Sequence, residues 1–412
     1  MQGWEWLRAG GLARWQAACA ADAVLARHLP GARARFGLAQ PGLSVRIDME
    51  DGVLTLALGE GGATIFAAAA ASWGPFLAPL PPRHHHNLFA MRMRVPGFTV
   101  AGDELAWMQH AHLLRRVLEL ARWVANGGAG MPPESLRPAG SAAPLPTARG
   151  RYVQVGDVVL YGEQHGEGSP ILGLHTAGAD GRQFHRLAAE PALAGHAIVA
   201  FDMPGHGRSP PLAAPGAWAL DTELYARLVL GFREAWGFTE NPVLLGASMS
   251  GEICLEIALR APGRFSHIVA CEACEHIPGR RTPWPLHPAV NAMLFTPEWV
   301  EGLMAPQSPA PCAAEIWWHY SQGGYGTFPG DILFYSGGWD ARGRLGGIDT
   351  ARCPLTLMTG EYDYSCTQEA SAATAAQIVG ARFVPMPGIG HFPFAENPGV
   401  FAPLLLEALS RR

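Results

Sequence analysis

The feature that most constrains this chain is the stretch GASMSG at residues 246–251, which directly follows the apolar run 242–245. A serine between small residues, at a strand end and before a helical pattern, is typical of a nucleophile elbow. In that sharp turn the residues two before and two after the serine come into close contact, so Gly246 and Ser250 must be small. Gly251 then lets the helix pack closely on the strand. Gly/Ser-rich turns also produce G-x-S patterns by chance, so the motif needs support from elsewhere in the chain.

Further residues with catalytic chemistry follow other apolar segments. We expect buried strands at residues 171–174, 197–201, 266–271, 354–360 and 383–386. Asp363 comes just after the fourth of these strands and His391 just after the fifth. The order Ser248, Asp363, His391 and the motif itself resemble the alpha/beta-hydrolase superfamily, and the resemblance covers roughly residues 150–412. It implies an α/β fold class, with a mostly parallel eight-stranded sheet, helices on both faces and a helical cap.

The expected triad assigns one role to each of three side chains. The Ser248 hydroxyl is a poor nucleophile at its ordinary pKa, so a base must take its proton during attack. His391 is the candidate base, because imidazole titrates near neutral pH and can return the proton to the leaving group. Asp363 would accept the other ring N–H, fix the tautomer and stabilise the imidazolium.

The expected oxyanion hole consists of the backbone N–H groups of Ala177 and Met249. Members of the superfamily usually have His-Gly where this chain has His175-Thr176. In this departure from the superfamily pattern, the Thr176 hydroxyl is a candidate additional donor.

The acid of the triad has a second candidate. Glu272 follows the expected strand 266–271, and some alpha/beta hydrolases carry their acid after that strand. Asp363 is preferred because the segment Gly360-Glu361-Tyr362-Asp363 is the more usual arrangement.

Residues 127–149 are rich in Gly, Pro, Ala and Ser without periodicity, so we expect a linker there. It separates a domain at 1–126 from the catalytic domain at 150–412. Within the first domain, apolar alternation around Asp51-Gly52 predicts a β-hairpin, and a helical pattern runs from Asp103 to about Trp123. These pieces weakly resemble the sterol-carrier-protein type of α+β lipid-binding domain over roughly residues 40–123. A plain α+β dimerisation module explains the same pattern, so a homodimer is one of the roles left open.

Residues 276–350 are too long for a simple connection in a compact sheet, and in this superfamily such an insertion is the cap over the active site. The segment is rich in aromatic residues: Trp284, Phe295, Trp299, Trp317, Trp318, Tyr320, Tyr325, Phe328, Phe334, Tyr335 and Trp339. We expect most of these rings to pack the cap onto the sheet and a few to contact a hydrophobic substrate.

Composition excludes several classes of protein. The chain has 412 residues, a net charge of −5 and a pI of about 6.3, which give no basic surface for nucleic acid. No apolar run approaches the roughly 20 residues of a membrane span, and no secretory signal is evident. Seven unevenly spaced cysteines indicate reduced thiols and a cytoplasmic location. The pattern predicts no metal or other cofactor, because the single CxxC lacks a partner pair and the adjacent histidines 84–86 point in different directions.

Together these features predict a serine hydrolase that cleaves an ester, thioester or lactone of a bulky hydrophobic small molecule through an acyl-enzyme. One alternative is a C–C bond hydrolase, or a biosynthetic lyase or cyclase, with the same triad. The other is a non-catalytic hydrophobic-ligand binder on a hydrolase fold.

Overall fold

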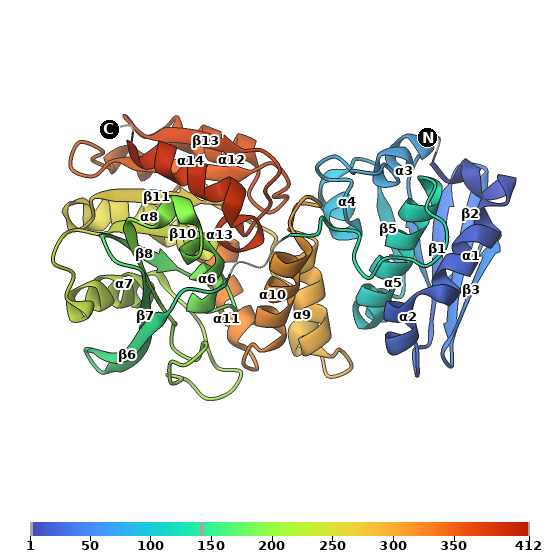
Figure 1. Cartoon of the computed structure of the whole chain (residues 1–412), viewed down its shortest axis with the longest axis horizontal. Coiled ribbons are helices and arrows are strands. Elements are labelled where there is room, and N and C mark those ends of the chain that lie inside the picture. Colours follow the sequence, from blue (N-terminus) through green and yellow to red (C-terminus); the bar gives the residue numbers. More distant parts are fainter. Residues whose placement is uncertain (1–2, 141–143, 411–412) are drawn as a thin grey trace. The chain divides into compact units, whose positions relative to one another are not determined.

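The computed structural model describes residues 3–140 and 144–410 (Figure 1). Its contacts divide the chain into two compact units. The N-terminal unit comprises residues up to Pro138 together with His287–Gly302, and the C-terminal unit comprises Ala139–Leu286 and the residues from Leu303 on. The expected linker 127–149 therefore spans the division between them, and its residues 141–143 lie outside the described residues.

The C-terminal unit is built on one eight-stranded sheet with the order β13-β12-β11-β10-β8-β9-β7-β6. The two strands at one edge, β6 and β7, are antiparallel to each other, and β7 is antiparallel to β9. All other pairs are parallel. The strands are β6 (Ala148–Val155), β7 (Val158–His165), β8 (Ser169–Leu174), β9 (His196–Phe201), β10 (Val243–Ala247), β11 (His267–Cys271), β12 (Leu355–Gly360) and β13 (Arg382–Met386). The predicted α/β class and the mostly parallel eight-stranded sheet are confirmed.

Helices cover both faces of this sheet (Figure 1). They are α6 (His185–Ala188), α7 (Thr222–Trp236), α8 (Met249–Arg260), α12 (Gln368–Ala375), α13 (Pro393–Glu396) and α14 (Pro398–Ser410). The central strands are fully buried, and β11 and β12 read as continuous runs of buried residues because both of their faces are covered. Their carboxyl ends meet at one edge of the sheet, which brings the loops after β10, β11 and β12 together.

Two helices of the C-terminal unit come from the long insertion between β11 and β12. They are α10 (Ala310–Ser321) and α11 (Thr327–Leu333). Of the aromatic residues named above, Tyr320, Phe328, Phe334, Tyr335 and Trp339 are buried in this unit, whereas Trp318 and Tyr325 are exposed. Most of the rings thus serve packing.

The N-terminal unit has a five-stranded sheet with the order β3-β2-β1-β4-β5. Only the β1–β4 pair is parallel. The strands are β1 (Ala34–Gln40), β2 (Leu43–Glu50), β3 (Val53–Leu58), β4 (Thr64–Ala67) and β5 (Thr99–Gly102). The predicted hairpin is confirmed as β2 and β3, with Asp51 and Gly52 at positive φ in its turn.

The helices of this unit are α1 (Gly11–Ala21), α2 (Ala23–His28), α3 (Ala70–Phe76), α4 (Leu88–Arg94), α5 (Glu104–Ala125) and α9 (Ala292–Glu301). The predicted helix after Asp103 is confirmed as α5, since the Asp103 carboxylate accepts the Ala106 N–H at 3.1 Å and caps the first turn. Trp4, Trp15, Trp73 and Trp107 are fully buried and form the aromatic part of the core. Among the described residues, no helix of either unit is both long and apolar enough to cross a membrane.

Helix α9 lies with the N-terminal unit, although its residues fall inside the segment expected to form the cap. The physical reason is charge pairing. Arg115 on α5 donates to Glu298 at 2.7 Å and lies 3.7 Å from Glu301, and Arg137 donates to Glu301 at 2.5 Å. These carboxylates are buried, so leaving them without the arginines would be costly. Phe295 and Trp299 of α9 are accordingly buried in the N-terminal unit.

Candidate active site

Ser248 occupies a strained turn between β10 and α8. Its φ of 63° and ψ of −126° lie outside the regions that a serine ordinarily adopts. The Ser248 N–H donates to the carbonyl of Cys271 at 3.1 Å, which ties the turn to the end of β11. The hydroxyl makes no capping bond to α8, although Ser248 is the N-cap residue, and the residue is only 2% exposed. A buried serine held at positive φ with an uncommitted hydroxyl is the arrangement that the sequence motif predicts.

The small residues of the motif are required by close approach, as expected. A Cβ on Gly246 would lie 2.5 Å from the carbonyl oxygen of Ser250. A Cβ on Gly251 would lie 2.1 Å from the carbonyl oxygen of Cys271, so only glycine lets α8 pack this closely on β11.

The structure brings Asp363 and His391 into direct contact. The His391 Nδ1 lies 2.7 Å from Asp363 Oδ2, and the Ser365 N–H donates to Asp363 Oδ1 at 2.7 Å. Burial by itself would raise the pKa of Asp363, but the charge and hydrogen bond of His391 outweigh it and lower that pKa. Because Nδ1 is bonded to the carboxylate, Nε2 lies on the opposite side of the ring. Nε2 is therefore the nitrogen that is left to accept a proton from a hydroxyl.

The loops that carry these two residues are joined by backbone hydrogen bonds. The Tyr362 N–H donates to the carbonyl of Ile389 at 2.9 Å, and the His391 N–H donates to the carbonyl of Leu303 at 3.1 Å. The positions of acid and histidine are thus fixed by backbone as well as by their own side chains.

Glu272, the second acid candidate, lies beside the Asp363–His391 pair. It is fully buried, and its carboxyl accepts the Gly360 N–H at 2.9 and 3.2 Å. One polar atom from each of Glu272, Asp363 and His391 lies within 4.8 Å of the other two. Burial, followed by the charge of Asp363 and a hydrogen bond with it, raises the pKa of Glu272. The hydrogen bond to the imidazole is made by Asp363.

Two groups of described residues hold three potential metal ligands within 4.8 Å of one another. The first is the group just described, in which the acids are already bonded to a histidine, a backbone N–H and each other. The second comprises Glu163, His165 and His185, and there Arg208 donates to the Glu163 carboxylate at 2.6 Å. The Arg208 guanidinium supplies the positive charge that a metal ion would bring to Glu163. Neither group is therefore assigned as a metal site.

The expected oxyanion residues lie in two short segments. In the oxyanion loop, residues 175–178, the Thr176 N–H donates to Gln183 at 2.9 Å and the Gly178 N–H donates to Asp331 at 2.8 Å. The Ala177 N–H between them makes no hydrogen bond to any described residue. Met249 is the first residue of α8, where backbone N–H groups lack partners within the helix.

The Thr176 hydroxyl, considered above as an additional donor, is already engaged. It is hydrogen-bonded to the Tyr320 hydroxyl at 2.6 Å and to the Gln183 side chain at 2.9 Å. The departure from His-Gly therefore anchors the loop to α10 in this structure.

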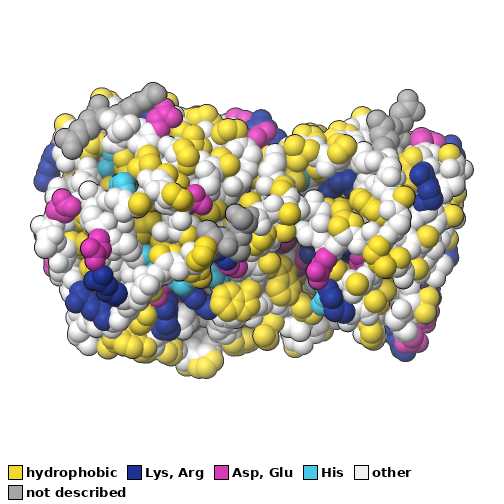
Figure 2. Space-filling view, in the orientation of Figure 1, with side chains coloured by type: hydrophobic (Ala, Val, Ile, Leu, Met, Phe, Trp, Pro, Cys, Tyr) yellow, Lys and Arg dark blue, Asp and Glu magenta, His cyan; other side chains and the backbone are white. Residues whose placement is uncertain are grey.

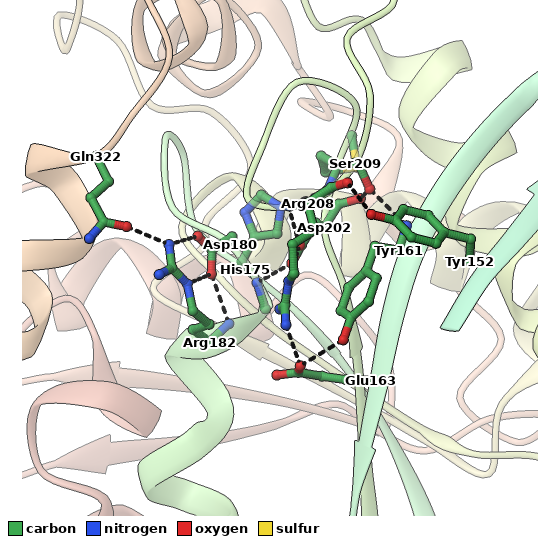
Figure 3. A network of polar contacts seen from close by, with 12 residues as sticks. Tyr152, Tyr161, Glu163, His175, Asp180, Arg182, Asp202, Arg208, Ser209 and Gln322 are labelled. Carbon is green, nitrogen blue, oxygen red and sulfur yellow. Dashed lines mark hydrogen bonds and ion pairs between the residues drawn. The ribbon is translucent and has the colours of Figure 1, made fainter. Parts of the chain in front are cut away.

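A network of buried charges holds the loops around residues 175–209 (Figure 3). Asp202 accepts the backbone N–H groups of Gly181 and Arg208, each at 2.8 Å, and the side chain of Arg208 donates to Glu163 at 2.6 Å. Burial alone would raise the pKa of Glu163, but its hydrogen bonds to His165, His185 and Arg208 hold that pKa well below its usual range. His175 accepts the Met203 N–H at 3.0 Å through Nε2 and so connects this network to the oxyanion loop.

Two further polar residues near the oxyanion loop are committed to such structural contacts. Arg182 forms a two-pronged pair with Asp180 at 2.8 and 2.6 Å (Figure 3). His206 contacts the buried Asp331 at 2.8 Å and braces its turn.

Sequence reasoning did not single out three residues that surround the site. The ring of Tyr335 lies 5.9 Å from that of His391, and its hydroxyl is 2.8 Å from the Ser365 hydroxyl. Gln183 and Asp331 hold the two N–H groups that flank Ala177. Tyr335 appeared only among many cap aromatics, and the other two are isolated polar residues whose partners are distant in sequence. The one sequence signal is that Asp331 is a polar residue among mostly apolar neighbours.

Comparisons with known proteins agree with this fold. A sequence model described as the alpha/beta hydrolase family matches residues 171–404. RutD of Azorhizobium caulinodans, a protein named as a carbamate hydrolase, is 28% identical over 269 residues, which is 62% of this chain and 96% of RutD. The enol-lactonase of Burkholderia xenovorans LB400 superposes with a TM-score of 0.54 at 20% identity, over 63% of this chain and 100% of that one. A thermophilic esterase of Thermogutta terrifontis gives a TM-score of 0.51 at 19% identity, over 64% of this chain and 98% of that one.

Proposed function

The chain belongs to the alpha/beta hydrolase family, and from this premise we propose that it is a serine hydrolase acting through an acyl-enzyme. The observation that carries the proposal is the Nδ1–Oδ2 contact of 2.7 Å between His391 and Asp363, in the same unit as a serine held at a φ of 63°. A binder that no longer catalysed would have no need to retain a strained serine together with a paired histidine and acid.

Each residue has a defined task in the proposed reaction. The Ser248 Oγ attacks the substrate carbonyl carbon while His391 Nε2 takes the hydroxyl proton. Asp363 holds Nδ1–H and stabilises the imidazolium that forms. The carbonyl oxygen becomes an oxyanion, which the N–H groups of Ala177 and Met249 stabilise.

Collapse of this intermediate expels the leaving group, which receives the proton from His391. Water then attacks the acyl-Ser248 ester with His391 again as base, releasing the acid product and restoring the serine. All bonds made and broken are accounted for without a cofactor.

We propose a bulky hydrophobic acyl compound, such as an ester, thioester or lactone, as the substrate class. Aromatic rings next to the triad and the oxyanion loop support this. Besides Tyr335, the ring of Phe392 lies 5.2 Å from that of His391 and the ring of Tyr320 lies 5.7 Å from that of Phe392. The relative RutD is named for carbamate cleavage, which also proceeds at a carbonyl carbon, so carbamates belong in the same test.

A panel of 4-nitrophenyl esters tests the substrate class. We expect kcat/KM to rise from the acetate to hexanoate and phenylacetate esters, because apolar rings contribute binding energy to a larger acyl group. A preference for acetate over every larger ester would contradict the substrate class. The S248A variant, run in parallel, separates enzymatic from spontaneous hydrolysis.

For the N-terminal unit we propose a role in binding a hydrophobic ligand or in forming a homodimer, in a cytoplasmic protein. Its five-stranded α+β architecture supports a separate module, and the buried free cysteines support a reducing compartment. Light scattering with and without a fluorescent fatty-acid probe distinguishes the two roles.

A further inference from the structure

Glu272 is a buried acid that the reaction described above does not use. We infer that Glu272 is a positioning residue whose carboxyl carries a proton and donates it in a hydrogen bond to Asp363, thereby orienting Asp363 toward His391. The inference rests on the proposed function only for its catalytic consequence. The shared proton itself is inferred from the burial of both carboxyls and their closeness to each other.

The backbone of Glu272 is held in an unfavourable conformation. Its φ is 51°, and among the described residues only Asp51, His84 and Ser248 are other non-glycine residues at positive φ. Two of these four residues therefore lie in the candidate active site. A left-handed glutamate immediately after a buried strand persists only when its surroundings hold it there.

Those surroundings link three parts of the site. The Glu272 N–H donates to the Met358 carbonyl at 2.9 Å, and the preceding Cys271 carbonyl accepts the Ser248 N–H at 3.1 Å. The Glu272 side chain accepts the Gly360 N–H, three residues before Asp363. Glu272 thus connects the nucleophile turn to the loop that carries the acid.

The charged groups that act most strongly on Glu272 are Asp363 and Glu396, both acids. The titratable groups facing it are Asp363, Glu396 on α13 and the Cys271 thiol on β11, with His391 beyond Asp363. Two adjacent buried carboxyls cannot both ionise at little cost, so one keeps a proton. The charge of His391 favours the ionised form at Asp363, which assigns the proton to Glu272.

A neutral acid in this position has a specific consequence for catalysis. Its O–H donates to the Asp363 carboxylate and removes part of the electron density that Asp363 offers to His391 Nδ1. We therefore expect the acid limb of the pH–rate profile to depend on Glu272. Asp363 is also restrained from rotating away from the imidazole.

Infrared difference spectroscopy of the full-length protein tests the proton directly. The wild type at neutral pH should show a protonated-carboxyl C=O band that E272Q lacks, and D363N should shift this band because its hydrogen-bond acceptor has changed. Glu252 on α8 provides the matched control. It is also fully buried with its pKa raised by burial, but neither of its carboxyl oxygens has a hydrogen-bond partner among the described residues. E252Q should remove a different band, and D363N should leave the Glu252 band unmoved.

The pH dependence of kcat/KM on 4-nitrophenyl acetate tests the consequence. E272Q replaces one neutral donor by another, so its acid limb should coincide with that of the wild type. E272L removes the donor, so its limb should move to higher pH and kcat should fall by about tenfold. Thermal unfolding of both variants checks that they are folded.

Two results would overturn the inference. If E272Q kept every protonated-carboxyl band of the wild type, Glu272 would be ionised in the wild type. An acid limb moved to lower pH by E272Q would show the same, because the change would then have removed a negative charge beside His391. Failure of the proposed function has a different signature, since S248A would then retain activity while the Glu272 band remained.

Discussion

Buried carboxylates in the N-terminal unit are paired with arginines, whereas those beside Ser248 in the C-terminal unit are paired with a histidine and with each other. Asp22 forms a pair with Arg116 at 2.5 Å, and Glu298 and Glu301 share Arg115 and Arg137. Asp363 and Glu272 are instead held by His391, two backbone N–H groups and a mutual hydrogen bond.

The difference separates acids that meet a fixed charge from an acid whose partner can gain and lose a proton. An arginine remains charged at every accessible pH, so an acid paired with it meets the same positive charge throughout and stabilises one packing. A histidine exchanges its proton near neutral pH, so an acid paired with it can stabilise a charge that appears and disappears during turnover. Both kinds of acid are fully buried, so burial alone does not distinguish them.

The largest expected effect comes from removing the nucleophile. S248A should lower kcat by about a million-fold, because histidine and acid have nothing to activate without the hydroxyl. Its midpoint of thermal unfolding should stay close to that of the wild type, since alanine retains the small Cβ that the turn accommodates. Ester hydrolysis and calorimetry on the same preparation check both points. Near-normal turnover by S248A would contradict the covalent mechanism.

The next effect separates the two acids of the site. D363N should lower kcat by about four orders of magnitude through loss of the correct histidine tautomer. E272Q should lower it by less than about tenfold, because the amide retains hydrogen bonds to Gly360 and Asp363. Steady-state kinetics of the two variants give the ranking, and the reverse order would make Glu272 the acid that contacts the histidine.

A third prediction tests an arginine-paired acid. R116M leaves Asp22 buried and unpaired, so it should cost about 3–5 kcal/mol of unfolding free energy. Hydrolysis of 4-nitrophenyl acetate by the protein that remains folded should be unchanged. The exposed pair of Arg8 and Glu5, 2.9 Å apart, is the matched control, and R8M should cost less than about 1 kcal/mol. Urea unfolding followed by tryptophan fluorescence measures the unfolding free energy of both variants. Equal decreases in R116M and R8M would contradict the distinction between buried and exposed pairs.

The smallest effect concerns the pH dependence of stability. Burial, with the nearby charge of Glu301, raises the pKa of Glu298 from 4.5 to about 7 in spite of Arg115. Between these values the unfolded state has lost a proton that the folded state keeps, so stability falls as the pH rises from 4.5 to about 7. E298Q should flatten that decline. Urea midpoints at several pH values check it, and an unchanged slope in E298Q would assign the decline to other groups.

Glu301 contributes with the opposite sign. Burial opposes its ionisation, but Arg115 and Arg137 outweigh burial and lower its pKa from 4.5 to about 2. Its stabilising contribution is present above pH 4.5 and is lost as the pH falls toward about 2. E301Q should therefore lower stability most above pH 4.5, and its difference from the wild type should shrink as the pH falls toward about 2, which distinguishes it from E298Q in the same measurements.

Local sequence signals sufficed where the chemistry itself imposes a spacing. The small residues around Ser248 are needed for the turn, and the alternation around Asp51-Gly52 predicts the hairpin correctly. The apolar runs separated by loops likewise predict the six strands from β8 to β13 of the C-terminal sheet.

Long-range pairing was out of reach of such signals. The assignment of α9 to the N-terminal unit depends on Arg115 meeting Glu298, and nothing local in residues 287–302 indicates a partner that far away. The engagement of Thr176 with Tyr320 and the closeness of Glu272 to Asp363 likewise depend on contacts between segments remote in sequence. Neighbouring parallel strands do bring their carboxyl ends together, which is why Glu272 was at least a candidate.

Covalent labelling tests the central claim most directly. A fluorophosphonate reacts only with a serine that a neighbouring base activates, so the wild type should gain one phosphonyl group, and peptide mass spectrometry should locate it on Ser248. D363N should react far more slowly and S248A not at all. Rapid, stoichiometric modification of S248A, or a wild-type protein that remains unlabelled while it hydrolyses esters, would contradict the assignment of Ser248, His391 and Asp363 as the catalytic residues.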